Sequence, residues 1–88
     1  MVEREVRIAN QLGLHARAAA KLVNLAGKYH SHITISTEQI CADAKSILGV
    51  LTLAAGKDTI VKIEVEGPDE KEWLEAITNL IENTFGED

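Results

Sequence analysis

The sequence predicts an α+β fold in which three helices pack on one face of a four-stranded antiparallel sheet. Four short segments alternate apolar and polar residues, which is typical of strands with one buried face. Three other segments carry apolar residues at spacings of three and four, which is typical of amphipathic helices. These segments follow the order β-α-β-β-α-β-α, and strands with one polar face favour an antiparallel sheet.

The four predicted strands differ in the clarity of their pattern. They cover residues 2–8, 30–36, 39–44 and 59–66. The last is the clearest, because Val61, Ile63 and Val65 alternate with charged residues. The first places Arg4 among the apolar residues of its inner face, so we expect that face to be only partly buried. The third is the weakest of the four.

Capping residues mark the ends of the predicted helices. The first helix covers residues 16–27 and stops at a glycine, which is typical of a helix C-terminus. The second covers residues 46–53, with Ser46 as its N-cap. The third is expected to begin with Pro68 at its first helical position, followed by acidic residues that favour the positive end of the helix dipole.

Composition limits the class of protein. A chain of 88 residues predicts one domain, residues 1–88, which is long enough to bury a core. A net charge of −5 and an aromatic content of 3% argue against nucleic-acid binding. Residues 1–57 carry seven Lys or Arg against four Asp or Glu, whereas residues 58–88 carry two against ten. This uneven distribution of charge has two interpretations. The first half could form a locally basic surface on an acidic protein, or the C-terminal helix could simply have an acidic face exposed to solvent.

Several residue types carry no predicted chemistry. Cys41 is the only cysteine, which excludes an internal disulfide, and we expect it to be a small core residue. His30 and His32 share one face of a strand but lack a third ligand, so neither a metal site nor a cofactor is expected. We expect Trp73 to pack at the edge of the last helix.

No segment resembles a signal peptide or a membrane span, which predicts a cytoplasmic protein.

His15 stands at the start of the first predicted helix. There the backbone N–H groups of Ala16, Arg17 and Ala18 lack partners within the helix and attract anions. The same helix end and the Arg17 guanidinium disfavour an imidazolium, which keeps the ring neutral and nucleophilic. Together they would also hold the charge of a phosphoryl group bound to His15. From residue chemistry alone, the alternative is an ordinary surface histidine.

Two motifs carry a family resemblance that spans nearly the whole chain. The segment Gly13–Ala19, Gly-Leu-His-Ala-Arg-Ala-Ala, closely resembles the active-site signature of the HPr family, the histidine-containing phosphocarriers of the bacterial sugar phosphotransferase system. The segment Lys45–Leu51 resembles the regulatory serine region of that family, and Ile63–Gly67 is also similar. The resemblance implies an open-faced β-sandwich.

The resemblance also implies a function. His15 would take up a phosphoryl group at Nδ1 from enzyme I, itself charged by phosphoenolpyruvate, and donate it to IIA components. Arg17 would lie beside the acceptor. Such a protein is a relay rather than an enzyme with turnover of its own. Ala18 departs from the commonest form of the motif, which has proline there; alanine keeps the N–H and stays helical, so we expect function to survive.

Ser46 has two interpretations. One is a helix cap, and the other, implied by the resemblance, is a site for a regulatory serine kinase/phosphorylase. A phosphate there would lie beside Ile47, Leu48 and Leu51, which we expect to be exposed for partner docking. Phosphorylation would then hinder docking, or would create a surface for a transcriptional regulator.

Three alternatives to a sugar phosphocarrier remain open. One is a paralogue in a nitrogen-related phosphotransfer chain, which would use the same His15. Another is a regulator that binds its target only after Ser46 is phosphorylated. The last is a small ligand-binding α+β domain, although nothing in the sequence indicates a pocket.

Overall fold

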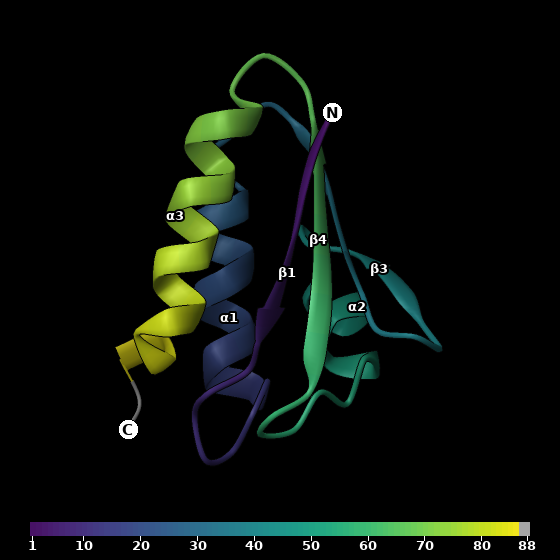
Figure 1. Ribbon diagram of the computed structural model, residues 1–88, viewed down its shortest axis with the longest axis vertical. Helices are drawn as coiled ribbons and strands as arrows, with labels where there is room; N and C mark the ends of the chain where they lie inside the picture. The colour runs from purple at the N-terminus through teal and green to yellow at the C-terminus, as the bar shows by residue number, and fades with distance from the viewer. Residues whose placement is uncertain (87–88) are drawn as a thin grey trace.

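The computed structural model describes residues 1–86 and confirms the predicted order of strands and helices (Figure 1). The elements are β1 (Val2–Arg7), α1 (Ala16–Ala26), β2 (His32–Ser36), β3 (Cys41–Asp43), α2 (Ile47–Thr52), β4 (Ile60–Glu66), α3 (Glu70–Glu82) and the short 3₁₀ turn η1 (Thr84–Gly86). The sequence did not predict η1. Within residues 1–86, no helix combines the length and apolar character needed to cross a bilayer.

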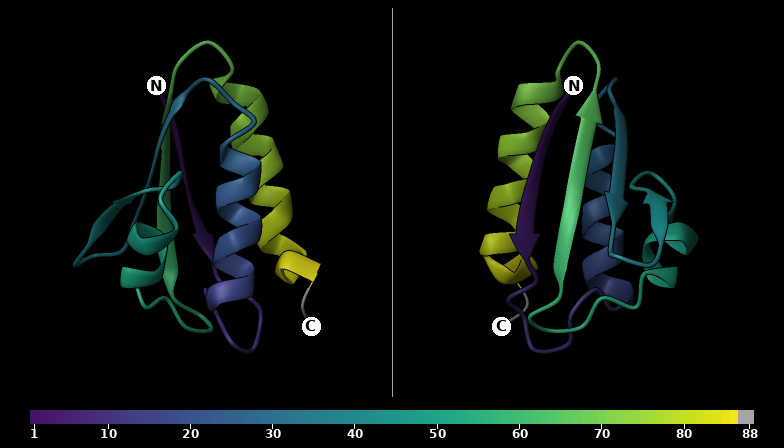
Figure 2. Two further views of the ribbon diagram at one scale, coloured as in Figure 1. Left: turned by 180° about the vertical axis from the view of Figure 1, so that it is seen from behind. Right: turned by 45° about the vertical axis from the view of Figure 1, so that its right-hand side comes forward.

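The four strands form one antiparallel sheet in the spatial order β1-β4-β2-β3. In the right-hand view of Figure 2 the sheet faces the reader and all three helices lie behind it. The α1 and α3 helices run side by side, and α2 packs against β3 and α1. No helix of residues 1–86 covers the opposite face of the sheet, so the open-faced arrangement is confirmed.

The core lies between the sheet and the helices. Val61, Ile63 and Val65 of β4 are fully buried, as their alternation predicts. Trp73 is also fully buried and makes an edge-to-face contact with Tyr29, with ring centroids 6.5 Å apart. The expectation that Trp73 packs at the helix edge is therefore wrong. It lies four residues before another buried residue of α3, so it belongs to the inner stripe of the helix.

Two further expectations need correction. Cys41 is exposed, because β3 is an edge strand on which Ala42 points inward and Cys41 points outward. Pro68 precedes α3 by two residues, and Asp69 is the N-cap. The Asp69 carboxylate does not cap its own helix; it binds another segment of the chain.

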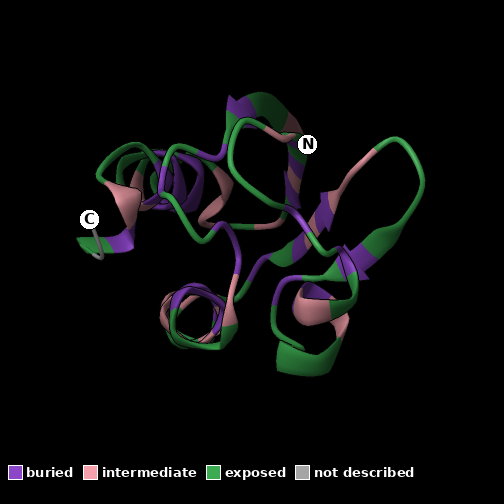
Figure 3. Cartoon of the chain, turned by 90° about the horizontal axis from the view of Figure 1, so that it is seen from below, coloured by how far each residue is buried: buried purple, intermediate pink, exposed green. Residues whose placement is uncertain are grey.

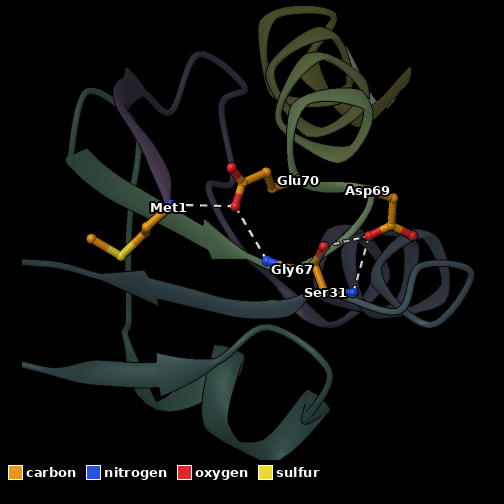
Figure 4. A network of polar contacts seen from close by, with 5 residues as sticks. All are labelled: Met1, Ser31, Gly67, Asp69 and Glu70. Atoms are coloured by element: carbon orange, nitrogen blue, oxygen red, sulfur yellow. Dashed lines mark hydrogen bonds and ion pairs between the residues drawn. The ribbon is translucent and has the colours of Figure 1, made fainter.

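Asp69 and Glu70 join three segments at the end of the molecule where the N-terminus lies (Figure 4). Asp69 accepts hydrogen bonds from the backbone N–H groups of His30 (2.9 Å) and Ser31 (3.0 Å) and from the Ser31 hydroxyl. Glu70 accepts one from the Gly67 N–H (3.2 Å) and pairs with the Met1 ammonium (3.4 Å). These contacts fasten the beginnings of β1, β2 and α3 to one another.

Candidate functional site

His15 is the N-cap residue of α1, at the opposite end of the molecule. Its backbone is extended, with φ −76° and ψ 177°, and its Nδ1 accepts a hydrogen bond from the Arg17 N–H at 3.2 Å. A ring nitrogen that accepts a hydrogen bond must carry a lone pair. This geometry is therefore assigned to a neutral imidazole whose proton resides on Nε2, an atom that is itself buried.

The first turn of α1 presents backbone donors beside this ring. The first helical hydrogen bond runs from the Ala19 N–H to the His15 carbonyl (2.8 Å), so the N–H groups of Ala16, Arg17 and Ala18 precede it. Within residues 1–86, no backbone acceptor engages the N–H of Ala16 or Ala18. The structure thus places the Arg17 N–H at Nδ1, and the N–H groups of Ala16 and Ala18 in the same first turn of α1.

The loop before His15 is held against the loop between α2 and β4. The Leu14 N–H donates to the Ala55 carbonyl at 2.8 Å. Gly13 has φ +65°, and a Cβ atom there would lie 2.3 Å from the same carbonyl oxygen. A side chain at position 13 is therefore excluded by both conformation and space. Gly13 belongs to the predicted motif, but this contact between loops has no signal in the sequence.

Ser46 is the N-cap of α2, as predicted. Its Oγ accepts a hydrogen bond from the Gly49 N–H at 3.1 Å. Ile47 is 41% and Leu48 74% exposed, whereas Leu51 is partly buried against the core. The predicted apolar surface is therefore made chiefly by Ile47 and Leu48.

The apolar residues of α2 lie close to the histidine end of α1. Figure 3 looks onto this end and shows α1 and α2 side by side, consistent with the packing of one helix on the other. Leu12, in the loop before His15, is 74% exposed and is a further apolar residue that sequence analysis missed. The sequence alone does not show whether an isolated leucine in a turn-like segment is buried or exposed.

Other candidate sites receive no support from the geometry. His30 and His32 are both exposed, and residues 1–86 contain no group of three side chains arranged to hold a metal ion. A hollow of ≈ 500 Å³ lies beside the open face of the sheet, where its lining includes Glu5, Ser36 and Lys62. His15 is not part of that lining.

Comparison with known proteins identifies the family. Residues 2–83 match the family model described as the PTS HPr component phosphorylation site. The chain belongs to the HPr family. It is 51% identical to the phosphocarrier protein HPr of Cupriavidus necator over 87 residues, which are 99% of this chain and 98% of the relative. It is 48% identical to the HPr of Pseudomonas aeruginosa over 84 residues, or 94% and 93% of the two chains.

Solved HPr structures share the fold. The structure of HPr-C-His from Thermoanaerobacter tengcongensis has a TM-score of 0.95 at 41% identity and covers 100% of this chain and 99% of its own. The Bacillus subtilis catabolite repression protein Crh has a TM-score of 0.76 at 32% identity and covers 96% and 97% of the two chains. The chain is thus an HPr-type phosphocarrier of the phosphotransferase system, with a regulatory protein among its structural relatives.

Proposed function

We propose that Nδ1 of His15 accepts a phosphoryl group from phosphorylated enzyme I and passes it to IIA components of the sugar phosphotransferase system. The observation that supports this most strongly is the position of Nδ1, which lies at the N-terminus of α1 and accepts the Arg17 N–H. In this proposal residues 1–88 act as one cytoplasmic domain, a relay that has no turnover of its own.

The chemistry follows from this geometry. The lone pair of Nδ1 forms a bond to phosphorus, and the bond between phosphorus and the donor breaks with its electron pair going to the donor. The Arg17 N–H can then no longer bind Nδ1 and donates instead to a phosphoryl oxygen, together with the N–H groups of Ala16 and Ala18. The Arg17 guanidinium adds a permanent positive charge. Because Nε2 keeps its proton, the ring gains positive character, which makes the phosphoryl group transferable.

The exposed apolar residues suggest how partners bind. Ile47 and Leu48, with Leu51 behind them, provide apolar contact area next to the phosphate site. We infer that both enzyme I and the IIA components dock here, since enzyme I must bring its phosphoryl donor, and each IIA component its phosphoryl acceptor, to His15.

Ser46 supports a second, regulatory role. Its hydroxyl is on an exposed residue at the start of α2, directly before Ile47. We infer that a serine kinase/phosphorylase modifies it. The added charge would then impede docking through desolvation and repulsion and offer a surface for a transcriptional regulator.

The test follows phosphoryl uptake by intact mass. The protein is incubated with phosphoenolpyruvate and enzyme I, alongside His15→Ala and the matched control His30→Ala. We expect one acid-labile, alkali-stable phosphoryl group on the native chain and on His30→Ala, and none on His15→Ala. Absence of uptake from both a sugar-type and a nitrogen-type enzyme I would refute the proposal, whereas uptake from the nitrogen-type enzyme alone would support the paralogue.

A further inference from the structure

Asn10 is a fully buried polar residue in the loop between β1 and α1. Its Nδ2 donates a hydrogen bond to the Gly13 carbonyl at 2.7 Å, and the Gly13 N–H donates to the Asn10 carbonyl at 3.2 Å. The Gly13 carbonyl also accepts the His15 N–H at 2.9 Å. Asn10 and His15 are therefore connected through a single peptide group, whose oxygen both of them bind.

The other polar atom of the Asn10 side chain is poorly accommodated. Oδ1 is buried and has no hydrogen-bond partner among residues 1–86. Leaving a buried acceptor unsatisfied costs more free energy than one neutral hydrogen bond contributes. Stability alone would therefore favour an apolar residue of similar size at this position. The bond that Asn10 makes to Gly13 needs an explanation other than stability.

That bond controls a peptide group next to the acceptor residue. The carbonyl of Gly13 belongs to the peptide that leads into Leu14, whose own N–H is held by Ala55 at 2.8 Å. Both the carbonyl and the N–H of this peptide group are therefore hydrogen-bonded. This fixes the orientation of the backbone that leads into His15. The extended backbone of His15 then directs Nδ1 toward the Arg17 N–H.

We propose that Asn10 is a positioning residue of the His15 site. Its Nδ2 hydrogen bond to the Gly13 carbonyl holds the loop in the conformation that directs Nδ1 of His15 to the first-turn N–H groups of α1. The consequence for phosphoryl transfer rests on the function proposed above, whereas the consequence for the imidazole ring does not.

Asn10→Leu tests the proposal, because leucine has a similar size and removes both the donor and the unsatisfied acceptor. We expect its midpoint of urea unfolding to equal or exceed that of the native chain. Its rate of phosphoryl uptake from enzyme I should fall about ten-fold, as expected when a nucleophile is slightly misplaced. The nitrogen-15 resonance of Nδ1 and the amide proton of Arg17 should both shift as their hydrogen bond weakens.

The matched control is Thr78→Val, which removes a buried hydroxyl bound by Arg4 (3.4 Å), a contact between α3 and β1. It should leave the rate and the His15 ring unchanged. Asn10→Asp keeps the shape and replaces the donor by an acceptor, so it should reproduce the slow uptake even if Asn10→Leu does not fold.

Two results would overturn the proposal: native uptake and ring resonances in both Asn10 variants, or slow uptake with unchanged ring resonances. If the native chain itself takes up no phosphate, the proposed function fails. The ring and amide resonances still decide whether Asn10 positions His15.

Discussion

Ala18 is the residue at which this site differs from the commonest form of the HPr motif, and the difference adds a backbone N–H group. Proline at that position has no donor, whereas here the N–H lies in the first turn of α1 and is not engaged by a backbone acceptor within residues 1–86. Phosphorylation of His15 would supply an acceptor. The substitution is therefore expected to alter the stability of the phosphorylated state rather than the fold.

Ala18→Pro should lower the equilibrium fraction of phosphorylated protein at a fixed ratio of phosphoenolpyruvate to pyruvate. The expected shift in the equilibrium constant is about ten-fold or more, the size of one charge-assisted hydrogen bond. The unfolding midpoint should change little, since proline is tolerated in a first turn. An equilibrium constant equal to that of the native chain would show that the Ala18 N–H does not hold the phosphoryl group.

Gly13→Ala should destabilise the protein by about 2–4 kcal/mol, because it combines an unfavourable φ with a clash against backbone. The Cβ atom would meet the Ala55 oxygen at 2.3 Å. Gly56→Ala is the control from the facing loop; its Cβ atom would have no neighbour within 4 Å, so we expect a change below about 0.5 kcal/mol. Urea unfolding measures both, and equal values would contradict the proposed steric cause.

At the scale of elements, α2 depends on its cap more than a longer helix would. It has six residues, and one buried apolar residue, Val50, anchors it. A helix this short gains little from its own hydrogen bonds. The Ser46 hydroxyl therefore contributes both to the helix and to the position of Ile47 and Leu48 beside the proposed phosphate site.

Ser46→Ala and Ser46→Asp should separate the structural from the regulatory role. Loss of the cap should cost about 1 kcal/mol in urea unfolding and leave phosphoryl uptake at His15 nearly native. Aspartate also caps helices, so Ser46→Asp should keep the stability but slow uptake by placing charge next to Ile47. If Ser46→Asp takes up phosphate as fast as the native chain, charge at this position does not impede docking.

On the scale of the whole molecule, the contacts of Asp69 make the fold sensitive to acid. Hydrogen bonds from the Ser31 hydroxyl and from the His30 N–H lower the pKa of Asp69 below its ordinary value. The hydrogen bond from the Gly67 N–H likewise lowers the pKa of Glu70. A lowered pKa in the folded state means that the stabilisation is complete above the unfolded-state pKa and is lost as the pH falls through the folded-state pKa.

Asp69→Asn should therefore lower the urea midpoint at neutral pH. It should also reduce the further decrease of the midpoint as the pH falls below the ordinary aspartate pKa of about 4 toward the lowered pKa of the folded state. Asp58→Asn is the control, since Asp58 is exposed and its carboxylate makes only a long ion pair with Arg7, at 4.0 Å, among the described residues. The pH dependence of the urea midpoint of Asp58→Asn should follow that of the native chain. A native-like pH profile for Asp69→Asn would contradict the assignment.

The sequence by itself determined the fold class, the order of the elements and the location of His15 at the start of a helix. These follow from periodicity and capping, which are local properties that neighbouring residues decide. Ser46 was correctly predicted as a cap for the same reason. The family motif added the expectation of phosphate chemistry, because the residues of the proposed acceptor site are consecutive in the chain.

The tertiary structure alone decided the features that depend on distant segments. Cys41 is exposed because β3 is an edge strand, and Trp73 is buried because the inner stripe of α3 faces the core. The bond of Asn10 to Gly13 spans three residues, yet its burial arises only in the folded molecule, where the neighbouring Leu14 N–H is held by Ala55 in the loop between α2 and β4. No local pattern encodes such packing, since it depends on which surfaces meet when the chain is closed.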